Sequence, residues 1–209
     1  SMVLNGNDLY ISDGDTGEII KLDITDATPT TSTVVLAGIS TPTALALNES
    51  DLYISAINAS KIIKTDITDP SPTSTDVVTG IMASKFLLND NNLIISEYFQ
   101  NNVSKIDITD TVPTLTNVLT NVNSPSGLAI NGNDLYISKF NENKISKIDI
   151  TDPTLTLTDV VTGLNGPNSL FLNGNELYIS ERSGDKISKI DITDPSPTLV
   201  DVVTGLNGP

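Results

Sequence analysis

Three residue types are missing from this 209-residue chain: cysteine, histidine and tryptophan. Without Cys there is no disulfide framework, no thiolate nucleophile and no Cys-ligated zinc. Without His there is no His-based catalytic triad and no imidazole metal ligand. Basic residues are scarce, because 11 Lys and Arg stand against 26 Asp and Glu, for a formal net charge of −15. Such a charge repels phosphate backbones, so we expect no nucleic-acid partner.

Long apolar runs are missing as well. No stretch approaches the roughly 18 residues of a membrane span, so we expect no membrane contact. Hydrophobic residues make up 38% of the chain. A chain of this length buries roughly 70% of its unfolded surface, so a stable core requires no disulfide or metal. The composition therefore indicates a globular protein and names no reaction.

The chain contains five tandem copies of one sequence motif. The phrase Leu-Tyr-Ile-Ser, or Leu-Ile-Ile-Ser in the third copy, recurs at steps of 43, 41, 42 and 42 residues. A second phrase, Asp-Ile-Thr-Asp, recurs at the same steps. The repeats span approximately residues 2–41, 42–83, 84–124, 125–166 and 167–209, within a single domain over 1–209. Such uniformity indicates recent duplication or deliberate design, and both remain open.

Each copy is expected to form four short β-strands. In the fourth copy an apolar run at 127–130 ends at Asn131-Gly132, which favours a tight hairpin. Strands at 134–138, 144–150 and 157–164 follow, separated by a turn at 141–143 and by Thr151-Asp152-Pro153. Four antiparallel strands in about 42 residues are typical of a propeller blade. The sequence therefore predicts an all-β protein, a β-propeller of five four-stranded antiparallel blades, with a β-solenoid as the structural rival.

The sequence motifs of the repeats resemble those of known propellers. Pro-x-Gly-Leu-Ala-Ile at Pro125–Ile130, followed by Leu-Tyr-Ile-Ser and Lys-Ile-Ser-Lys-Ile-Asp, resembles the NHL repeat and is similar to the SMP-30/gluconolactonase group. The resemblance implies a propeller fold over all five copies. Enzymes of the gluconolactonase type hold a divalent ion with Glu, Asn and Asp near the channel, but the corresponding stretches 42–47, 84–88, 125–130 and 167–172 contain no Asp or Glu. A related propeller lyase group relies on a His, which this chain lacks.

Antiparallel alternation places the loops between second and third strands at one end of each blade. These loops vary between copies, whereas the turns at the other end are uniform, and variable loops on a rigid frame are where function is commonly found. We therefore expect a partner protein or carbohydrate to be contacted here. The alternative is that these loops are only solvent-exposed and vary without functional constraint. The candidate contact residues are Asp13, Asp15, Glu18, Glu97, Tyr98, Phe99, Lys139, Phe140, Glu181 and Arg182.

Two features of these candidates leave alternatives open. The aromatic side chains Tyr98, Phe99 and Phe140 can stack on a ligand or fold down and pack between blades, and packing is favoured. The segment 13–18 carries three carboxylates that could hold Ca²⁺, but it lacks EF-hand spacing, so an Asp-x-x-Gly turn is favoured. No cofactor and no metal site are otherwise expected.

The repeated Asp-Ile-Thr-Asp is interpreted as structural. Each stands at the end of a third strand, where the side chain can cap the following turn. Lysines in the same strands, such as Lys144 and Lys147, are expected to form Lys–Asp pairs worth under about 1 kcal/mol each.

Five whole blades leave no strand to interlock the two ends of the chain. We expect a closed monomeric ring, with an open or oligomeric array of blades as the alternative. The expected function is a non-catalytic binding or scaffold propeller, secreted or on a bacterial cell surface. The alternatives are a divalent-metal-dependent, lactonase-like hydrolase and an engineered or recently amplified repeat protein with no specific ligand.

Overall fold

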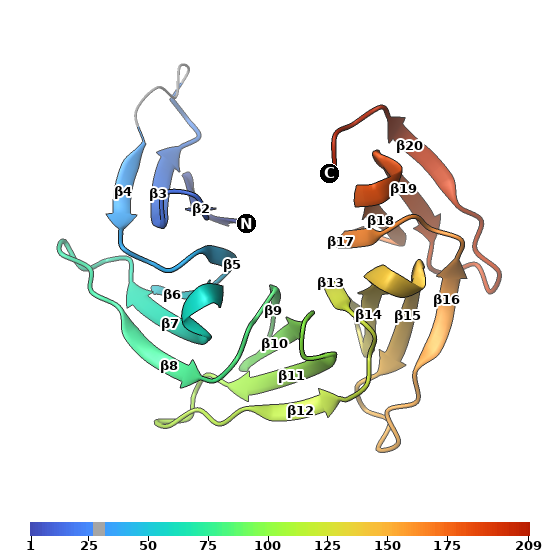
Figure 1. Ribbon diagram of the computed structural model, residues 1–209, viewed down its shortest axis with the longest axis horizontal. Coiled ribbons are helices and arrows are strands. Elements are labelled where there is room, and N and C mark those ends of the chain that lie inside the picture. The colour runs from blue at the N-terminus through green and yellow to red at the C-terminus, as the bar shows by residue number, and fades with distance from the viewer. Residues whose placement is uncertain (27–31) are drawn as a thin grey trace. The chain divides into compact units, whose positions relative to one another are not determined.

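The computed structural model describes residues 1–26 and 32–209. It contains five four-stranded sheets, and within each sheet the hydrogen-bonded order of the strands follows their order in the chain (Figure 1). Each sheet is one antiparallel blade, so the predicted five-bladed all-β propeller is confirmed.

The strands of the five blades are as follows. The first blade comprises β1 (Met2–Asn5), β2 (Asp8–Asp13), β3 (Glu18–Asp23) and β4 (Thr33–Leu36). The second comprises β5 (Pro42–Asn48), β6 (Asp51–Ala56), β7 (Lys61–Asp66) and β8 (Thr75–Thr79). The third comprises β9 (Lys85–Asn89), β10 (Asn92–Glu97), β11 (Asn102–Asp107) and β12 (Thr116–Leu119). The fourth comprises β13 (Pro125–Asn131), β14 (Asp134–Lys139), β15 (Lys144–Asp149) and β16 (Thr158–Thr162). The fifth comprises β17 (Pro167–Asn173), β18 (Glu176–Glu181), β19 (Lys186–Asp191) and β20 (Val200–Thr204).

In the described part of the chain the helical segments are three short 3₁₀ turns, and each lies between the second and third strands of a blade. They are η1 (Ile57–Ala59), η2 (Phe140–Glu142) and η3 (Arg182–Gly184). No described helix has the length and apolarity that a membrane crossing requires.

The chain divides into two compact units. One comprises residues 1–95 and 105–116, and the other comprises residues 96–104 and 117–209. The third blade contributes residues to both. Among residues 1–26 and 32–209, two apolar cores lie in the first unit and one lies in the second. The expectation of a single domain over 1–209 with the five repeat boundaries given above stays a prediction.

The Leu-Tyr-Ile-Ser phrase explains how the blades pack. Alternation along a strand sends successive side chains to opposite sides of the sheet. We call the side that carries the second-strand Tyr face A, and the side that carries the Leu and Ile face B. In the fourth blade Tyr136 on face A pairs with Ala129, whereas Ile137 on face B pairs with Leu128. One phrase thus supplies apolar groups to both neighbours of a blade.

Within each unit, face A of one blade packs on face B of the next. In the second unit, Tyr136 and Ile145 of the fourth blade join Leu177 and Ile179 of the fifth in one buried cluster. In the first unit, Tyr10 and Ile19 of the first blade join Leu52 and Ile54 of the second. The same arrangement joins the second blade to residues of the third. Burial of such side chains stabilises by roughly 1.5–3 kcal/mol each, so these interfaces hold the blades together.

The serine of the phrase closes the contact between blades by a hydrogen bond. The buried Ser55 hydroxyl donates to the carbonyl of Ala83 at 2.6 Å, and the buried Ser96 hydroxyl donates to the carbonyl of Ser126 at 2.7 Å. In both cases the acceptor lies immediately before or within the first strand of the next blade. A buried hydroxyl without a hydrogen-bond partner would cost about 1–3 kcal/mol. The carbonyl of the next blade supplies that partner, so serine can be buried at this position.

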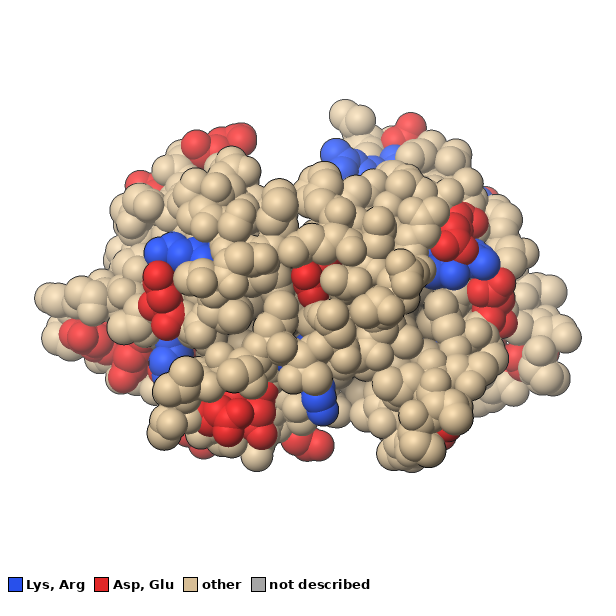
Figure 2. All heavy atoms as spheres, turned by 60° about the horizontal axis from the view of Figure 1, so that its bottom comes forward, with Lys and Arg blue, Asp and Glu red and all other residues tan. Residues whose placement is uncertain are grey.

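The lysines of the third strands pair across the sheet, as the sequence indicates. One set bonds the acidic residue at the start of the second strand, in the pairs Lys21–Asp8 (3.2 Å), Lys64–Asp51 (2.6 Å), Lys147–Asp134 (2.7 Å) and Lys189–Glu176. A second set bonds the fourth strand, in the pairs Lys61–Asp76 (2.6 Å), Lys144–Asp159 (2.9 Å) and Lys186–Asp201 (2.7 Å). Lysine groups accordingly lie beside carboxylates on the surface (Figure 2). These partly exposed pairs are each worth under about 1 kcal/mol.

Candidate functional site

The loops between second and third strands share one backbone feature. Each ends in a residue with positive φ immediately before the third strand: Gly17 (72°), Ser60 (50°), Asn101 (58°), Asn143 (54°) and Asp185 (52°). Gly, Asn and Asp are the residues that most readily adopt this left-handed conformation. Four of the five residues are of these types, and their recurrence at the repeat period is a sequence signal that the predictions above did not use.

The left-handed residue ties each loop to the segment that follows the fourth strand of the same blade, which in the first four blades is the connector to the next blade. Its carbonyl accepts a backbone N–H from that segment in all five copies, for example from Val122 to Asn101 at 2.8 Å and from Leu164 to Asn143 at 3.0 Å. The corresponding donors in the other copies are Ile39, Ile81 and Leu206. Each loop is therefore fixed to the frame at the end that leads into the third strand.

In three copies the side chain of this residue adds a second bond. The amide oxygens of Asn101 and Asn143 accept the N–H groups of Ser124 and Gly166, each at 2.9 Å. The carboxylate of Asp185 accepts the N–H of Gly208, also at 2.9 Å. These bonds hold the loops of the third to fifth blades at a defined distance from the connectors beside them.

Three aromatic side chains meet on the loops of the third and fourth blades. The ring centroids of Tyr98 and Phe99 lie 5.1 Å apart, and those of Tyr98 and Phe140 lie 5.8 Å apart, both edge to face. We call Tyr98, Phe99 and Phe140 the aromatic cluster. The Phe140 ring also lies beside Gly166, where a Cβ would come within 3.1 Å of it. The favoured interpretation, packing between blades, is thus seen for Tyr98 and Phe140.

Phe99 differs from its two neighbours. It is 63% exposed, whereas Tyr98 and Phe140 are half-buried. The Phe99 ring is already held by the ring of Tyr98, so it loses little conformational entropy when a partner covers it. Exposed aromatic side chains of this kind supply much of the binding free energy of protein interfaces. Of the aromatic cluster, Phe99 is the side chain presented to solvent.

Three charged candidates lie beneath the surface. Glu97 and Glu181 are each 1% exposed, and Lys139 is also buried. They occupy equivalent positions at the end of the second strand, on face B. Exposure on the rim was expected of them, and for these three that expectation is wrong. Of the candidate contact residues, Asp15, Phe99 and Arg182 are exposed.

Each buried group has partners that compensate its charge or polarity. The Ser104 hydroxyl donates to the Glu97 carboxylate and burial raises the pKa of Glu97, an effect that this bond partly opposes. The Glu181 carboxylate accepts the Ser188 hydroxyl and, at 2.8 Å, the N–H of Asn165. Lys139 pairs with Glu142 at 2.8 Å. Such buried groups fix the base of the loops, because breaking one bond leaves an unpaired group.

In the acidic segment at 13–18, the Asp13 side chain caps the turn that it begins. Its carboxylate accepts the N–H groups of Asp15 (3.0 Å) and Thr16 (3.3 Å), and these bonds lower the pKa of Asp13. The turn interpretation of this segment is therefore supported. Asp15 is exposed and Glu18 is half-buried. Among residues 1–26 and 32–209 no group of three or more Asp or Glu side chains is placed to hold a metal ion.

At the opposite end of the blades the predicted caps are confirmed in every copy. The first Asp of each Asp-Ile-Thr-Asp accepts both the N–H and the hydroxyl of the Thr two residues later, as in Asp149 with Thr151 (N–H at 2.8 Å). The other pairs are Asp23–Thr25, Asp66–Thr68, Asp107–Thr109 and Asp191–Thr193. The hydrogen bonds lower the pKa of each Asp.

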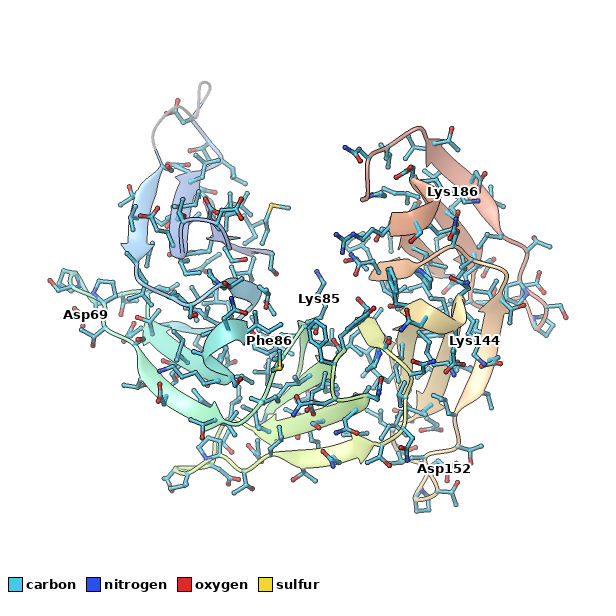
Figure 3. The ribbon with its side chains drawn as sticks, viewed as in Figure 1. Asp69, Lys85, Phe86, Lys144, Asp152 and Lys186 are labelled. Atoms are coloured by element: carbon cyan, nitrogen blue, oxygen red, sulfur yellow. The ribbon has the colours of Figure 1, made fainter. Side chains whose placement is uncertain are left out.

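In the second, fourth and fifth copies the second Asp of the phrase caps the residue after the proline that follows it. Asp69 accepts the N–H of Ser71, and Asp152 accepts the N–H of Thr154, each at 2.9 Å. Figure 3 shows Asp69 and Asp152 out at the loop tips, away from the body of their blades. These carboxylates are occupied by local turns, which supports the structural interpretation of the acidic repeats.

No protein-family profile and no curated protein matches the chain. Solved structures do match. A structure of the nidogen/laminin complex is 15% identical with a TM-score of 0.78, over 97% of this chain and 80% of that one. A streptogramin B lyase is 18% identical with a TM-score of 0.75, over 98% and 68%. A catalytically inactive histidine-to-alanine variant of virginiamycin B lyase from Staphylococcus aureus with quinupristin is 16% identical with a TM-score of 0.70, over 96% and 68%. At these identities the likeness establishes the β-propeller fold, shared by proteins in a binding complex and by a lyase.

Proposed function

We propose that this chain is a non-catalytic binding propeller that contacts a partner protein through the loops between second and third strands, with the aromatic cluster as its anchor. The observation that carries the proposal is Phe99, a phenylalanine 63% exposed on a loop and backed by the ring of Tyr98. Exposing a large apolar ring is unfavourable in water, and covering it with a partner recovers that free energy.

The loop that carries Phe99 is preorganised. Asn101, two residues after Phe99, is tied to the connector by its carbonyl and by its side chain. On the neighbouring loop the Asn141 amide donates to the Ser124 hydroxyl at 2.6 Å. A surface already held in one conformation loses less entropy when it binds, so the same contacts give higher affinity.

The repeat family and the class of partner are supported by other observations. The motif at Pro125–Ile130 supports placing these repeats with NHL-type propellers. The solved propeller in the nidogen/laminin complex supports a protein as the class of partner. Against a lyase reaction of the kind seen in the similar structures, these 209 residues contain no histidine, and the inactive lyase variant is one that has lost a histidine.

The test is a selection of binding peptides from a displayed random library. Binders selected on the unaltered protein are titrated calorimetrically against Phe99→Ser. We expect the variant to bind them at least about tenfold more weakly, because aromatic anchors dominate interface energies. The matched control is Val112→Ser, since Val112 is 77% exposed on the loop after the third strand, at the other end of the blades.

The proposal is wrong if the selected peptides bind Phe99→Ser as tightly as the unaltered protein. A glycan array probed with the same three proteins decides between partner classes. Glycan binding that is lost in Phe99→Ser, with no peptide binder recovered, would replace the protein partner by a carbohydrate.

A further inference from the structure

The first and fifth blades each carry a face that their own compact unit leaves exposed, although the same face is buried in other blades. On face A of the fourth blade Ala129, Tyr136 and Ile145 are 5%, 2% and 0% exposed. On face A of the fifth blade Phe171, at the position of Ala129, is 68% exposed. Tyr178 and Ile187, which match Tyr136 and Ile145, are half-buried rather than buried.

The first blade shows the complementary situation on face B. Leu45 of the second blade, which packs against the first, is 6% exposed. The residue at the same register in the first blade is Met2, which pairs with Ile11 as Leu45 pairs with Ile54, and it is 67% exposed. Leu4 is 53% exposed on the same face.

These two faces are the two halves of one interface that the chain builds repeatedly. Face A of the first blade already packs on face B of the second, and face A of the fourth on face B of the fifth. The position of Phe171 is filled by Val3, which packs on the second blade, and by Ala129, so the interface accepts side chains of different size. Phe171 and Tyr178 lie with ring centroids 6.5 Å apart and form the centre of the exposed face.

We propose that the chain associates head to tail with a second copy of itself, face A of the fifth blade in one copy packing on face B of the first blade in the other. The occupant is a second copy because this chain carries the matching face at its other end and reproduces the contact between its own blades. Such an interface is heterologous, so each copy keeps one free face and association can continue beyond two chains. This inference does not depend on the aromatic cluster.

The net charge of −15 opposes this association at low salt. Screening lengths fall from about 30 Å at 0.01 M salt to about 8 Å at 0.15 M, so repulsion between copies weakens while apolar packing persists. The average mass should therefore rise with salt.

Sedimentation velocity over a range of protein concentrations tests the proposal. The unaltered protein should exceed the 22.2 kDa of one chain as its concentration rises. Phe171→Glu and Met2→Glu should each associate at least about tenfold more weakly, since a charge is then buried against apolar groups. Both positions are exposed, so circular dichroism should show unchanged folding. Val112→Glu adds the same charge away from both faces and should associate like the unaltered protein.

Mixing the two variants makes the test specific to a head-to-tail contact. Phe171→Glu retains an intact first-blade face, and Met2→Glu retains an intact fifth-blade face, so the mixture should form a complex of two chains that grows no further. A mixture that stays at the mass of one chain overturns the proposal. So does an unaltered protein that stays at 22.2 kDa at every concentration and salt, which is the result expected if each chain covers its own faces or another segment covers them.

Discussion

The chain reverses direction at both ends of each blade, but the hydrogen bonds that hold the turns differ between the two ends. At the uniform end Asp149 bonds a residue two positions later, and the turn is complete within itself. At the variable end Asn143 bonds Gly166, which lies 23 residues later on the connector to the next blade. A local cap makes a turn independent of its surroundings, whereas a distant bond couples a loop to the packing of the next blade.

This difference teaches which end can carry variation. The uniform end needs its Asp and Thr in every copy, because those two side chains form the turn. At the variable end the fixed requirement is one left-handed residue, whose carbonyl forms the tie, so the residues before it are free to differ. The candidate contact residues lie on that end.

The largest effect should follow from Gly17→Ala. A Cβ at Gly17 would lie 2.6 Å from the carbonyl oxygen of Ile39, and the backbone there has φ of +72°. The neighbour is itself held by the bond from Ile39 N–H to the Gly17 carbonyl at 2.9 Å. We expect a loss of about 3 kcal/mol in the free energy of unfolding, measured by urea denaturation.

The control for this prediction is Gly6→Ala, where φ is +59° but no atom lies within 4 Å of the added Cβ. It should cost about 1 kcal/mol, the penalty of the left-handed backbone alone. Equal losses at Gly17 and Gly6 would mean that the connector does not press on the loop, and the contrast between the two ends would fail.

A smaller effect is expected from Asn143→Ala. This change removes the bond to the Gly166 N–H and places alanine at φ of 54°, for a combined loss of about 2 kcal/mol. Asn143→Gly removes only the bond and should cost about 1 kcal/mol, because glycine tolerates this backbone. If the glycine variant unfolds at the same urea concentration as the unaltered protein, the side-chain tie contributes nothing.

The smallest effect should distinguish the two ends by the sign of their pH dependence. Hydrogen bonds lower the folded-state pKa of Asp149, so its stabilisation is present above the unfolded pKa of about 4 and is lost as pH falls through the folded pKa. Burial raises the pKa of Glu97, so its charged form disfavours folding above that pKa, and stability is regained as pH falls.

The measurement is the melting temperature of Asp149→Asn and Glu97→Gln between pH 7 and pH 2. At pH 7 the first variant should melt below the unaltered protein and the second above it. Both differences should shrink in acid as the carboxyl groups take up protons. A Glu97→Gln variant that melts below the unaltered protein at pH 7 would contradict the destabilising role of the buried charge.

Much of the fold could be predicted because its determinants are local and repeated. The alternation in Leu-Tyr-Ile-Ser assigns the two faces of a strand, and the Asp and Thr of Asp-Ile-Thr-Asp lie two residues apart, so both strand and cap can be inferred without knowing any neighbour. The five-bladed architecture follows from the number of copies. The cross-strand lysine pairs were also foreseeable, although their partners belong to the second and fourth strands.

The burial of the site residues could not be predicted in the same way. Glu97 is the last residue of β10 and Phe99 lies two residues later on the loop, yet Glu97 is buried and Phe99 is exposed. The partner of the buried Glu97 is the Ser104 hydroxyl, seven residues later on the third strand, and the sequence around Glu97 does not specify that bond. Phe171 likewise occupies a position that is buried in the fourth blade, and its exposure depends on which blade follows.

The complementary faces of the blades also bear on how such a chain can evolve. Because face A of one blade fits face B of the next, a gene that gains or loses one whole repeat by unequal recombination still encodes only interfaces that it already had. Blade number can then change in a single genetic event without any new pair of surfaces having to be selected. The last two repeats match at 28 of 38 aligned positions over Ile130–Pro167 and Leu172–Pro209, a similarity that recent duplication and deliberate design would both produce.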